Sequence, residues 1–519
     1  MSGSHILDNI MRASGIGPFE EAQVGYGGVH MYNMTTHYNG FSQLYDNAVI
    51  LAVCNLTSSC ILEDLKLEGD SVIVKAKQST TTAVRNVTVN NSTKGGVQIY
   101  IHQCHVEVDD IDIRDTFRRY AAGVNVEIAN GGSVNISNIY LHNLNTYIGG
   151  NCFHFMAAYN ATFNLRNATC DTGSIVGDGG GSLAGCSGLV ATVNQTSITV
   201  TDTHWYNLYG AAVGTIGLEL VNGSSLILED SDFENVHSNF VGGGVSVALN
   251  QSCEATLRNI IFNKCTAVNG GGVWLGSYVN STATVVDCHF TENLAEGFGG
   301  GLYANMVTSS LVVTNSTFSN NTAPLFDSSG LYVDFSNSEG GLAQISFYAS
   351  ELENNLAVFK GGGNISFTPG QVQRINGSFV VDNTTLMRME ATAKLEIEGK
   401  FYVSGNLQVV VGDVTLNSSD PITLATYSSV EGQFESVTFV DEKGGSCQGK
   451  AEYLATTMQV IMQCPTDGPT VPVGAIVGGV VGGVLGLALI VGGLSWFFLV
   501  YRPRRLATKR VSSKIASTM

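Results

Sequence analysis

Acidic and basic side chains stand close together in one short stretch near residue 110. Its charged residues are Asp109, Asp110, Asp112, Arg114, Asp115 and Arg118. Paired carboxylates with a basic group beside them can supply the acid and the base that cleave a glycosidic bond. Alternation along a β-strand would place Asp110 and Asp112 on one face, opposite Ile111 and Ile113. The same pattern is typical of an ordinary solvated strand, which is the simpler interpretation. Asp110, Asp112 and Arg114 are therefore weak catalytic candidates.

Other chemical motifs are incomplete. The histidines show no HxH or HExxH spacing, so we predict no metal site. Residues 444–450 match GxxxxGK, but Ala451 follows where the phosphate-binding motif needs a hydroxyl. No Asp-x-Asp-x-Asp-Gly loop is present for calcium. We therefore predict no cofactor, and a non-enzymatic function is favoured over catalysis.

A repeat of 28 to 34 residues runs through the middle of the chain. Each copy places an apolar residue shortly before a glycine-rich corner, and weaker copies extend upstream to residue 19. The apolar position is held by Phe233, Phe262, Phe290, Phe318 and Leu352, and the corner by Gly244, Gly272, Gly301, Gly330 and Gly363. A period of this length indicates stacked repeats.

The units contain short runs of β-forming residues and no amphipathic helix, which excludes an alternating β/α fold. We predict roughly a dozen coils whose strands pair in parallel with the equivalent strands of the next coil. The apolar positions then form an interior ladder, and the corner glycines need a positive φ or space without a side chain. Two more ladders are expected, one of Asn293, Asn321 and Asn355, and one at a turn with Asp230, Asn259, Asp287 and Asn315.

This pattern resembles the right-handed parallel β-helix repeats of the polymorphic outer-membrane-protein type, with their FxxN and GGA(I/V/L) signatures. The matches are Phe290 with Asn293, Phe318 with Asn321, and the Gly-Gly-Gly-Val/Leu corners. The resemblance covers residues 225–365 and implies an all-β, right-handed parallel β-helix, with adhesion only by analogy. The chain differs from that family because it ends in a Gly-rich helix and a basic tail instead of an outer-membrane barrel.

We expect six segments along the chain. They are an N-terminal segment or partial cap (1–18), the β-helix repeats (19–385), terminal coils with a β-rich cap (386–464), a linker (465–472), a transmembrane helix (473–500) and a cytosolic basic tail (501–519). A cap is expected because the open end of a solenoid exposes unpaired strand edges.

Residues 473–500 carry no charge and are long enough to cross about 30 Å of hydrocarbon as a helix. Basic residues follow, which places the tail in the cytosol and the larger part outside. Residues 1–17 lack a secretory signal, so we expect either a truncated chain, which we favour, or insertion directed by the anchor. A homodimer through the anchor is expected from small residues spaced for close helix packing, at Gly474, Gly478, Gly482 and Gly486.

Cysteines and glycosylation sequons all precede residue 473. The 11 cysteines show no CxxC pattern, so we expect disulfides, at least one thiol left over, and a Cys447–Cys464 bridge. N-x-S/T sequons begin at Asn33, Asn55, Asn86, Asn135, Asn160, Asn194, Asn222, Asn250, Asn280, Asn315, Asn364, Asn376, Asn383 and Asn417. Those from Asn160 to Asn280 are predicted to occupy the same turn in five successive coils. Glycans there would leave the face beside the Gly-Gly-Gly corners open to a ligand.

The net charge is −18, and six basic residues with no acid follow Tyr501, so the remainder carries −24 (−18 less six positive charges). An outer part this acidic repels phosphates, which excludes nucleic acid as a partner. We predict a single-pass plasma-membrane glycoprotein with its N-terminal domain extracellular. Our main hypothesis is a non-enzymatic rod for adhesion or recognition, with carbohydrate or another cell-surface ligand. The alternatives are an extracellular polysaccharide lyase or hydrolase on a pectin-lyase-like scaffold, and a passive coat component.

Overall fold

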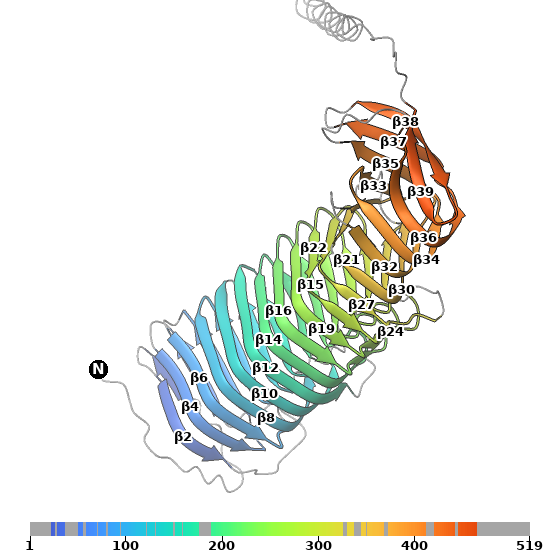
Figure 1. Ribbon diagram of the computed structural model, residues 1–519. Coiled ribbons are helices and arrows are strands. Elements are labelled where there is room, and N and C mark those ends of the chain that lie inside the picture. The colour runs from blue at the N-terminus through green and yellow to red at the C-terminus, as the bar shows by residue number, and fades with distance from the viewer. Residues whose placement is uncertain are drawn as a thin grey trace, which may run out of the picture. The chain divides into compact units, whose positions relative to one another are not determined.

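The computed structural model is built from β-strands stacked in coils (Figure 1). It describes residues 22–463 apart from 26–28, 37–49, 56–58, 70, 79–80, 94, 121, 130, 149–150, 158, 176–187, 325–329, 337–343, 349, 368–371, 412–419 and 442–444. Its 39 strands are joined in one hydrogen-bonded network. Within these residues the chain is therefore all-β, as the repeat predicts.

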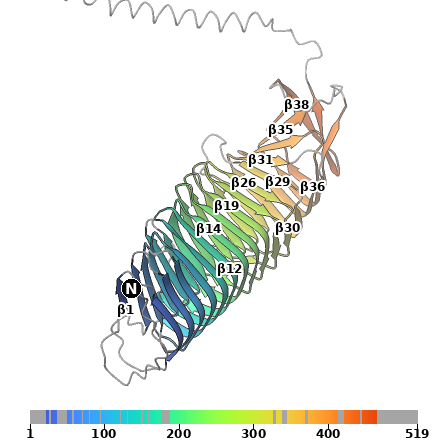
Figure 2. The same ribbon diagram turned by 90° about the vertical axis from the view of Figure 1, so that its left-hand side faces the viewer.

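Three parallel sheets form the sides of the coils, and the chain visits them in turn. The first sheet holds β1 (Ala22–Gly25), β3 (Ile50–Asn55), β5 (Val72–Lys77), β7 (Val97–His102), β9 (Val124–Ala129), β11 (Phe153–Ala157), β13 (Leu189–Asn194), β15 (Ile216–Val221), β18 (Val245–Asn250), β21 (Val273–Ser277), β25 (Leu302–Met306) and β28 (Leu331–Phe335). Both views show strands of successive coils stacked side by side (Figures 1 and 2). Parallel pairing with the next coil satisfies the backbone hydrogen bonds.

Long strands bend around a corner and serve both the second and the third sheet. They are β2 (Val29–Thr36), β4 (Ser59–Glu68), β6 (Thr81–Asn90), β8 (His105–Tyr120), β10 (Gly132–Ile148), β12 (Ala161–Ile175), β14 (Ser197–Gly210), β16 (Ser225–Glu234) and β19 (Glu254–Asn263). Later in the chain the two sheets have separate strands. The second sheet continues with β22 (Thr282–Val286), β26 (Ser310–Thr314), β29 (Gln344–Tyr348), β31 (Asn364–Phe367), β33 (Leu386–Glu390), β35 (Asn406–Val411) and β37 (Ser436–Asp441).

The third sheet continues with β23 (His289–Thr291), β27 (Thr317–Ser319), β30 (Glu351–Gly361), β32 (Val372–Val381), β34 (Lys394–Val403) and β36 (Ile422–Gly432). The last four also reach the first sheet, because the second half of β30 pairs with β28. A short fourth side is formed by the last residues of the long strand β14, which pair with β17 (His237–Ser238), and it continues in β20 (Thr266–Ala267) and β24 (Leu294–Ala295). The antiparallel strands β38 (Ser446–Tyr453) and β39 (Thr457–Met462) pair with β37 and β36 and so cover the edge of the last coil.

The predicted interior ladders are confirmed. Phe233, Phe262, Phe290 and Phe318 are paired in register, and all four side chains are fully buried. Their ring centroids are 5.1, 4.9 and 4.5 Å apart along the stack, and Leu352 follows Phe318. The amide ladder also forms, with Nδ2 of one asparagine donating to Oδ1 of the next along Asn293, Asn321 and Asn355.

The predicted turn residues have left-handed backbone conformations. Asp230, Asn259, Asp287 and Asn315 have φ between 48° and 54°, and Asn259 Nδ2 donates to Asp230 Oδ1 over 2.7 Å. Asn and Asp tolerate this conformation because their side chains bond locally. Each of these residues turns the strand sharply from the second sheet into the third.

The corner glycines are required because a side chain would not fit there, and not because the backbone has a positive φ. An ideal Cβ on Gly272 would lie 2.9 Å from Cδ1 of Phe290, and one on Gly301 would lie 2.8 Å from Cδ1 of Phe318. The positive φ values belong to Gly270 and Gly299, two residues earlier in each corner. The Phe ladder therefore packs against glycines that must lack side chains.

The predicted anchor (473–500) and its packing glycines, the linker, the tail and Asn417 lie outside the described residues. Within the residues that the structure describes, we find no helix with the length and hydrophobicity of a membrane span.

Candidate functional site

Parallel stacking arranges the outward side chains of the first sheet in continuous rows across the strands. One row runs through Lys75, Tyr100, Glu127, Met156, Thr192, Glu219, Ala248, Gly276, Asn305 and Asp334. The neighbouring row includes Ser246, Trp274, Tyr303 and Tyr332. We call this surface the outer face. A row of this kind offers an elongated ligand a new side chain about every 4.8 Å.

An aromatic cluster on the outer face lies beside the Gly-Gly-Gly corners. Trp274, Tyr303 and Tyr332 occupy three successive strands, each two residues after its corner glycine. The Tyr303 and Tyr332 rings are stacked with their centroids 5.5 Å apart, and Phe298 lies 4.6 Å from Tyr332. Trp274 and Tyr303 are partly exposed, whereas Tyr332 is 5% exposed. The cluster forms a rigid platform with one solvent-facing side.

Gly276 allows the Trp274 indole to lie against the sheet. An ideal Cβ on Gly276 would lie 2.4 Å from Cη2 of Trp274. The missing side chain therefore sets the orientation of the indole, which a larger residue would lift away from the strand. The sequence does carry a signal for this cluster, since an aromatic residue stands two positions after each of three successive corner glycines. We did not predict the cluster from this signal.

Polar groups border the aromatic cluster. Burial, and then the charge of Asp334, raises the pKa of Tyr332 to about 12 and also raises that of Tyr303. Both phenols are therefore neutral at physiological pH and can donate hydrogen bonds. Asp334 Oδ1 accepts from the Ser336 amide over 2.8 Å. Flat rings with a few fixed polar groups are suited to an amphipathic ring such as a sugar.

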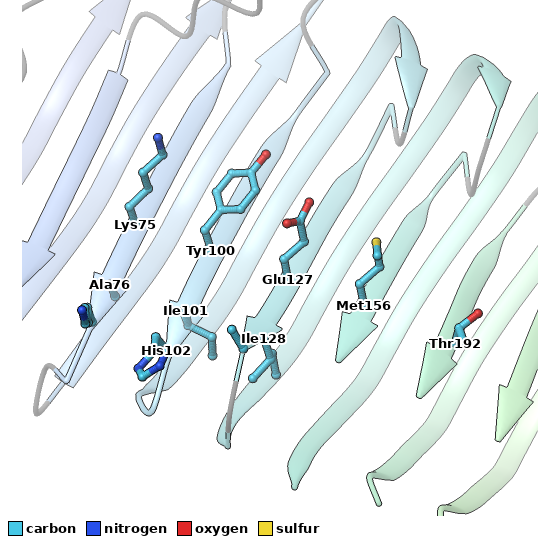
Figure 3. A pocket seen from close by; sticks show the side chains of 11 residues that line it. Lys75, Ala76, Tyr100, Ile101, His102, Glu127, Ile128, Met156 and Thr192 are labelled. Atoms are coloured by element: carbon cyan, nitrogen blue, oxygen red, sulfur yellow. The ribbon is translucent and has the colours of Figure 1, made fainter. Parts of the chain in front are cut away.

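At the other end of the outer face is a cavity of about 510 Å³ (Figure 3). Lys75, Tyr100, Glu127, Met156 and Thr192 point outward from successive strands along it. The Lys75 Nζ atom lies 5.9 Å from the centroid of the Tyr100 ring. This cavity and the aromatic cluster therefore share one continuous surface.

The three predicted catalytic residues do not form one carboxylate pair. Asp110 is exposed at a corner with φ 57°, and that corner reverses the alternation, so the prediction that it shares a face with Asp112 is wrong. Asp112 faces outward from the third sheet, where both of its oxygens accept from Arg114 at 2.8 Å. The hydrogen bonds and charge of Asp112 raise the pKa of the Arg114 guanidinium. Asp115 is a second corner residue, with φ 53°.

The rest of that surface holds titratable groups that the sequence did not bring together. We call it the polar stripe; its side chains are Asp112, Arg114, Tyr140, His142, Asp171, His204, Tyr206, Asp232 and Glu234. His142 Nδ1 lies 3.3 Å from Asp171 Oδ2, and His204 Nδ1 contacts Asp232. Burial and a hydrogen bond to Asp232 raise the pKa of Tyr206. The two histidine–aspartate pairs could not be recognised from the sequence, because the partners in each pair are separated by one whole coil.

No cluster of three metal-binding side chains occurs among the described residues. Three carboxylates of the polar stripe instead contact one basic side chain each: Asp112 contacts Arg114, Asp171 contacts His142, and Asp232 contacts His204. The prediction that this chain needs no metal stays a prediction.

The cysteines differ in part from the expectation of disulfides. Cys152 and Cys170 are bridged, and Cys60 and Cys447 are also disulfide-bonded. Cys464 lies outside the described residues, so the Cys447–Cys464 bridge stays a prediction. Buried thiols occur instead at Cys253, Cys265 and Cys288, at ladder positions where other coils carry small polar side chains. Burial raises the pKa of Cys288 to about 12 and that of Cys265 as well, which suppresses the reactive thiolate.

The five sequons from Asn160 to Asn280 do occupy one turn. Asn160, Asn222 and Asn280 are exposed with φ between 50° and 54°. Asn194 and Asn250 lie one position earlier in the turn, both in register with Val221. None of the described sequon asparagines whose side chains can be placed is buried. This turn follows the first sheet, on the side opposite the Gly-Gly-Gly corners.

Comparison with known proteins agrees with this architecture. A family model described as the right handed beta helix region matches residues 187–383. The chain is a right-handed parallel β-helix repeat protein. Neither the curated proteins nor the solved structures contain a match. The solenoid of about 11 turns agrees with the predicted coil architecture, while no relative assigns an activity.

Proposed function

We propose that this chain is a single-pass surface glycoprotein whose solenoid faces the outside of the cell and recognises carbohydrate without catalysis. The aromatic cluster of Trp274, Tyr303 and Tyr332 on the outer face carries the proposal. The apolar C–H face of a sugar ring packs on such a platform, while neighbouring polar groups bond its hydroxyls.

The position of the cluster supports the same proposal. It lies beside the Gly-Gly-Gly corners, and the sequon turn lies at the other end of the same strands. Glycans attached at Asn222 or Asn280 would therefore project away from the corner side. Parallel strands hold the rings without a mobile loop, which lowers the entropic cost of binding.

The proposed membrane topology has a direct test. The acidic, sequon-bearing part should be outside the cytosol because sequons and cysteines stop before residue 473 and basic residues follow residue 501. Treatment of the protein from a eukaryotic host with a glycosidase should increase its mobility by many glycans. An unchanged mobility would reject the topology.

Binding should be measured with the full chain in detergent micelles on a glycan array. For a bound glycan, Trp274→Ala should weaken affinity about tenfold, because the aromatic contact is worth about 1.5 kcal/mol. Ile261→Ala is the matched control, since Ile261 is an apolar residue 48% exposed on the third sheet. Equal losses in the two variants, or no change in either, would reject the outer face as the binding surface.

A second candidate function is polysaccharide cleavage, favoured by the polar stripe. His204 with Asp232, and His142 with Asp171, offer acid and base groups on neighbouring coils. The array polysaccharides should therefore also be incubated with the protein and assayed for new chain ends. If the protein cleaves a polysaccharide and Asp232→Asn abolishes that activity, cleavage would replace recognition as the proposed function. If the protein shows no binding and no turnover, a passive coat component would be favoured.

A further inference from the structure

We propose that the cavity at the N-terminal end of the outer face binds the anionic group of an acidic saccharide. The inference rests on the proposed carbohydrate recognition and names the class of sugar. The cavity holds about 510 Å³ and spans β5, β7, β9, β11 and β13 (Figure 3). Most of its lining side chains come from two outward rows, with the buried Ala76, Ile101 and Ile128 between those rows. Their chemistry differs from that of the aromatic cluster.

Two lysines supply the positive charge. Lys75 and Lys77 are exposed and stand two residues apart on the same face of β5, about 7 Å along the strand. Their flexible stems allow both ammonium groups to reach one carboxylate or sulfate. Neither lysine forms an ion pair within the part of the chain that the structure describes. His102 lies in register with Lys77 on the next strand.

The distribution of charge along the outer face favours binding of an anion at its N-terminal end, near β5. The chain as a whole is acidic, with a net charge of −18. Along the row of Lys75, the next carboxylate is Glu127, which lines the same cavity two strands away, and Glu219 and Asp334 follow on later strands. Glu127 Oε1 accepts from Asn125 over 3.4 Å, and Tyr100 lies between it and Lys75 in the row. A linear anionic polymer is therefore attracted at β5 and repelled further along the outer face.

Apolar surface in the same cavity suits a sugar ring and not a bare inorganic ion. Met156 is 50% exposed, and the Tyr100 ring stands between the Lys75 and Glu127 positions (Figure 3). Tyr100 Oη donates to Gln98 Oε1 over 3.2 Å, which holds the ring in place. Ring carbons of a saccharide can cover Tyr100 and Met156 while its anionic group reaches the lysines.

The test uses the full chain in detergent micelles and a matched set of ligands. The probes are a glucuronic-acid oligosaccharide, its neutral methyl ester, and a sulfated galactose oligosaccharide of equal length. We expect the acid to bind at least tenfold more tightly than the ester, with an affinity that falls as salt rises. A Lys75→Gln, Lys77→Gln double variant should lose about three- to thirtyfold in affinity for the acid.

A Lys394→Gln, Lys450→Gln variant is the control, because it removes the same charge at exposed positions far from the cavity. Its affinity should stay within twofold of the unchanged protein. Tighter binding of the sulfated probe than of the acid would support the site and identify sulfate as the preferred anion. Equal affinity for acid and ester, or equal losses in the two variants, would overturn the anionic site while Trp274-dependent binding would still support recognition. Failure of every saccharide to bind would overturn both.

Discussion

The central coils (225–322) and the C-terminal coils (351–411) form one solenoid with different corners. In the central coils, equivalent residues such as Cys265 and Asn293 are 28 apart, and a short fourth side lies between the third sheet and the first. In the C-terminal coils, Arg374 and Glu396 are equivalent and only 22 apart. The later coils are shorter because β30, β32 and β34 run from the third sheet directly into the first.

The corners of the two regions also differ in their backbone conformation. Each central coil turns at residues with a left-handed backbone, whereas no non-glycine residue with positive φ occurs beyond Asn320 in the described part of the chain. The C-terminal strands instead change register at Glu353/Asn355 and Ile397/Lys400. A bulge bends a strand without interrupting it. The C-terminal coils therefore differ from the central coils in corner type as well as in length, but corner type alone does not set the length, since the left-handed corners at Asp64 and Asn86 are also 22 residues apart.

The largest expected effect is loss of a ring from the interior. Phe290→Ala should cost about 3–5 kcal/mol of the free energy of unfolding, because it removes a fully buried ring between two others. Phe379→Ala, in the C-terminal coils, should cost a similar amount because Phe379 is equally buried. Denaturant unfolding measures both variants, and limited proteolysis around residues 262–318 reports on Phe290→Ala. Unchanged protease resistance in Phe290→Ala would contradict close packing of the central stack.

A smaller effect is expected at the central corner. Gly272→Ala should cost about 1–3 kcal/mol, because the new Cβ would lie 2.7 Å from the Gly301 carbonyl oxygen and 2.9 Å from the Phe290 ring. Gly223→Ala is the control, since its Cβ would meet open space and only its φ of +75° is unfavourable. Thermal unfolding of the two variants separates crowding from backbone strain. A larger loss in Gly223→Ala would show that conformation matters more than space.

The amide ladder can be both shortened and extended by single substitutions. Asn321→Ala should destabilise by about 1–3 kcal/mol, because Asn321 Oδ1 accepts from the Asn293 amide over 3.0 Å. Cys265 occupies the preceding ladder position, and its amide donates to Asn293 Oδ1 over 2.8 Å. Cys265→Asn should extend the ladder and stabilise by about 1 kcal/mol. Destabilisation by Cys265→Asn, seen by chemical denaturation, would mean that the thiol site is too small for an amide.

The smallest effect concerns pH. The pKa of Tyr332 is raised by burial to about 12, against about 10 in an unfolded chain. Its contribution to stability is complete below pH 10 and is lost as pH rises from 10 to about 12, since the unfolded state releases the proton first. Phenolate absorbance during alkaline titration should show a late-titrating tyrosine that disappears in Tyr332→Phe. Ordinary titration near pH 10 in the unchanged protein would contradict the burial of this phenol.

The sequence by itself determined the solenoid through its repeat. Phe290 and Phe318 recur at a constant spacing, and a parallel coil is the arrangement that buries both in one interior. The turn residues Asp287 and Asn315 were predictable for the same reason, since few residue types tolerate a left-handed backbone. These features follow from local chemistry repeated once per coil.

Only the tertiary structure decided which side chains meet across coils. Asp110 and Asp112 are close in sequence, yet Asp110 forms an exposed corner while Asp112 lies on the strand that follows it, because the corner at Asp110 interrupts the alternation. His204 and Asp232 are 28 residues apart and touch. The aromatic cluster likewise depends on the register that places Tyr303 beside Tyr332. Register is set by the packing of whole coils against one another, so no single repeat contains the information that assembles a surface.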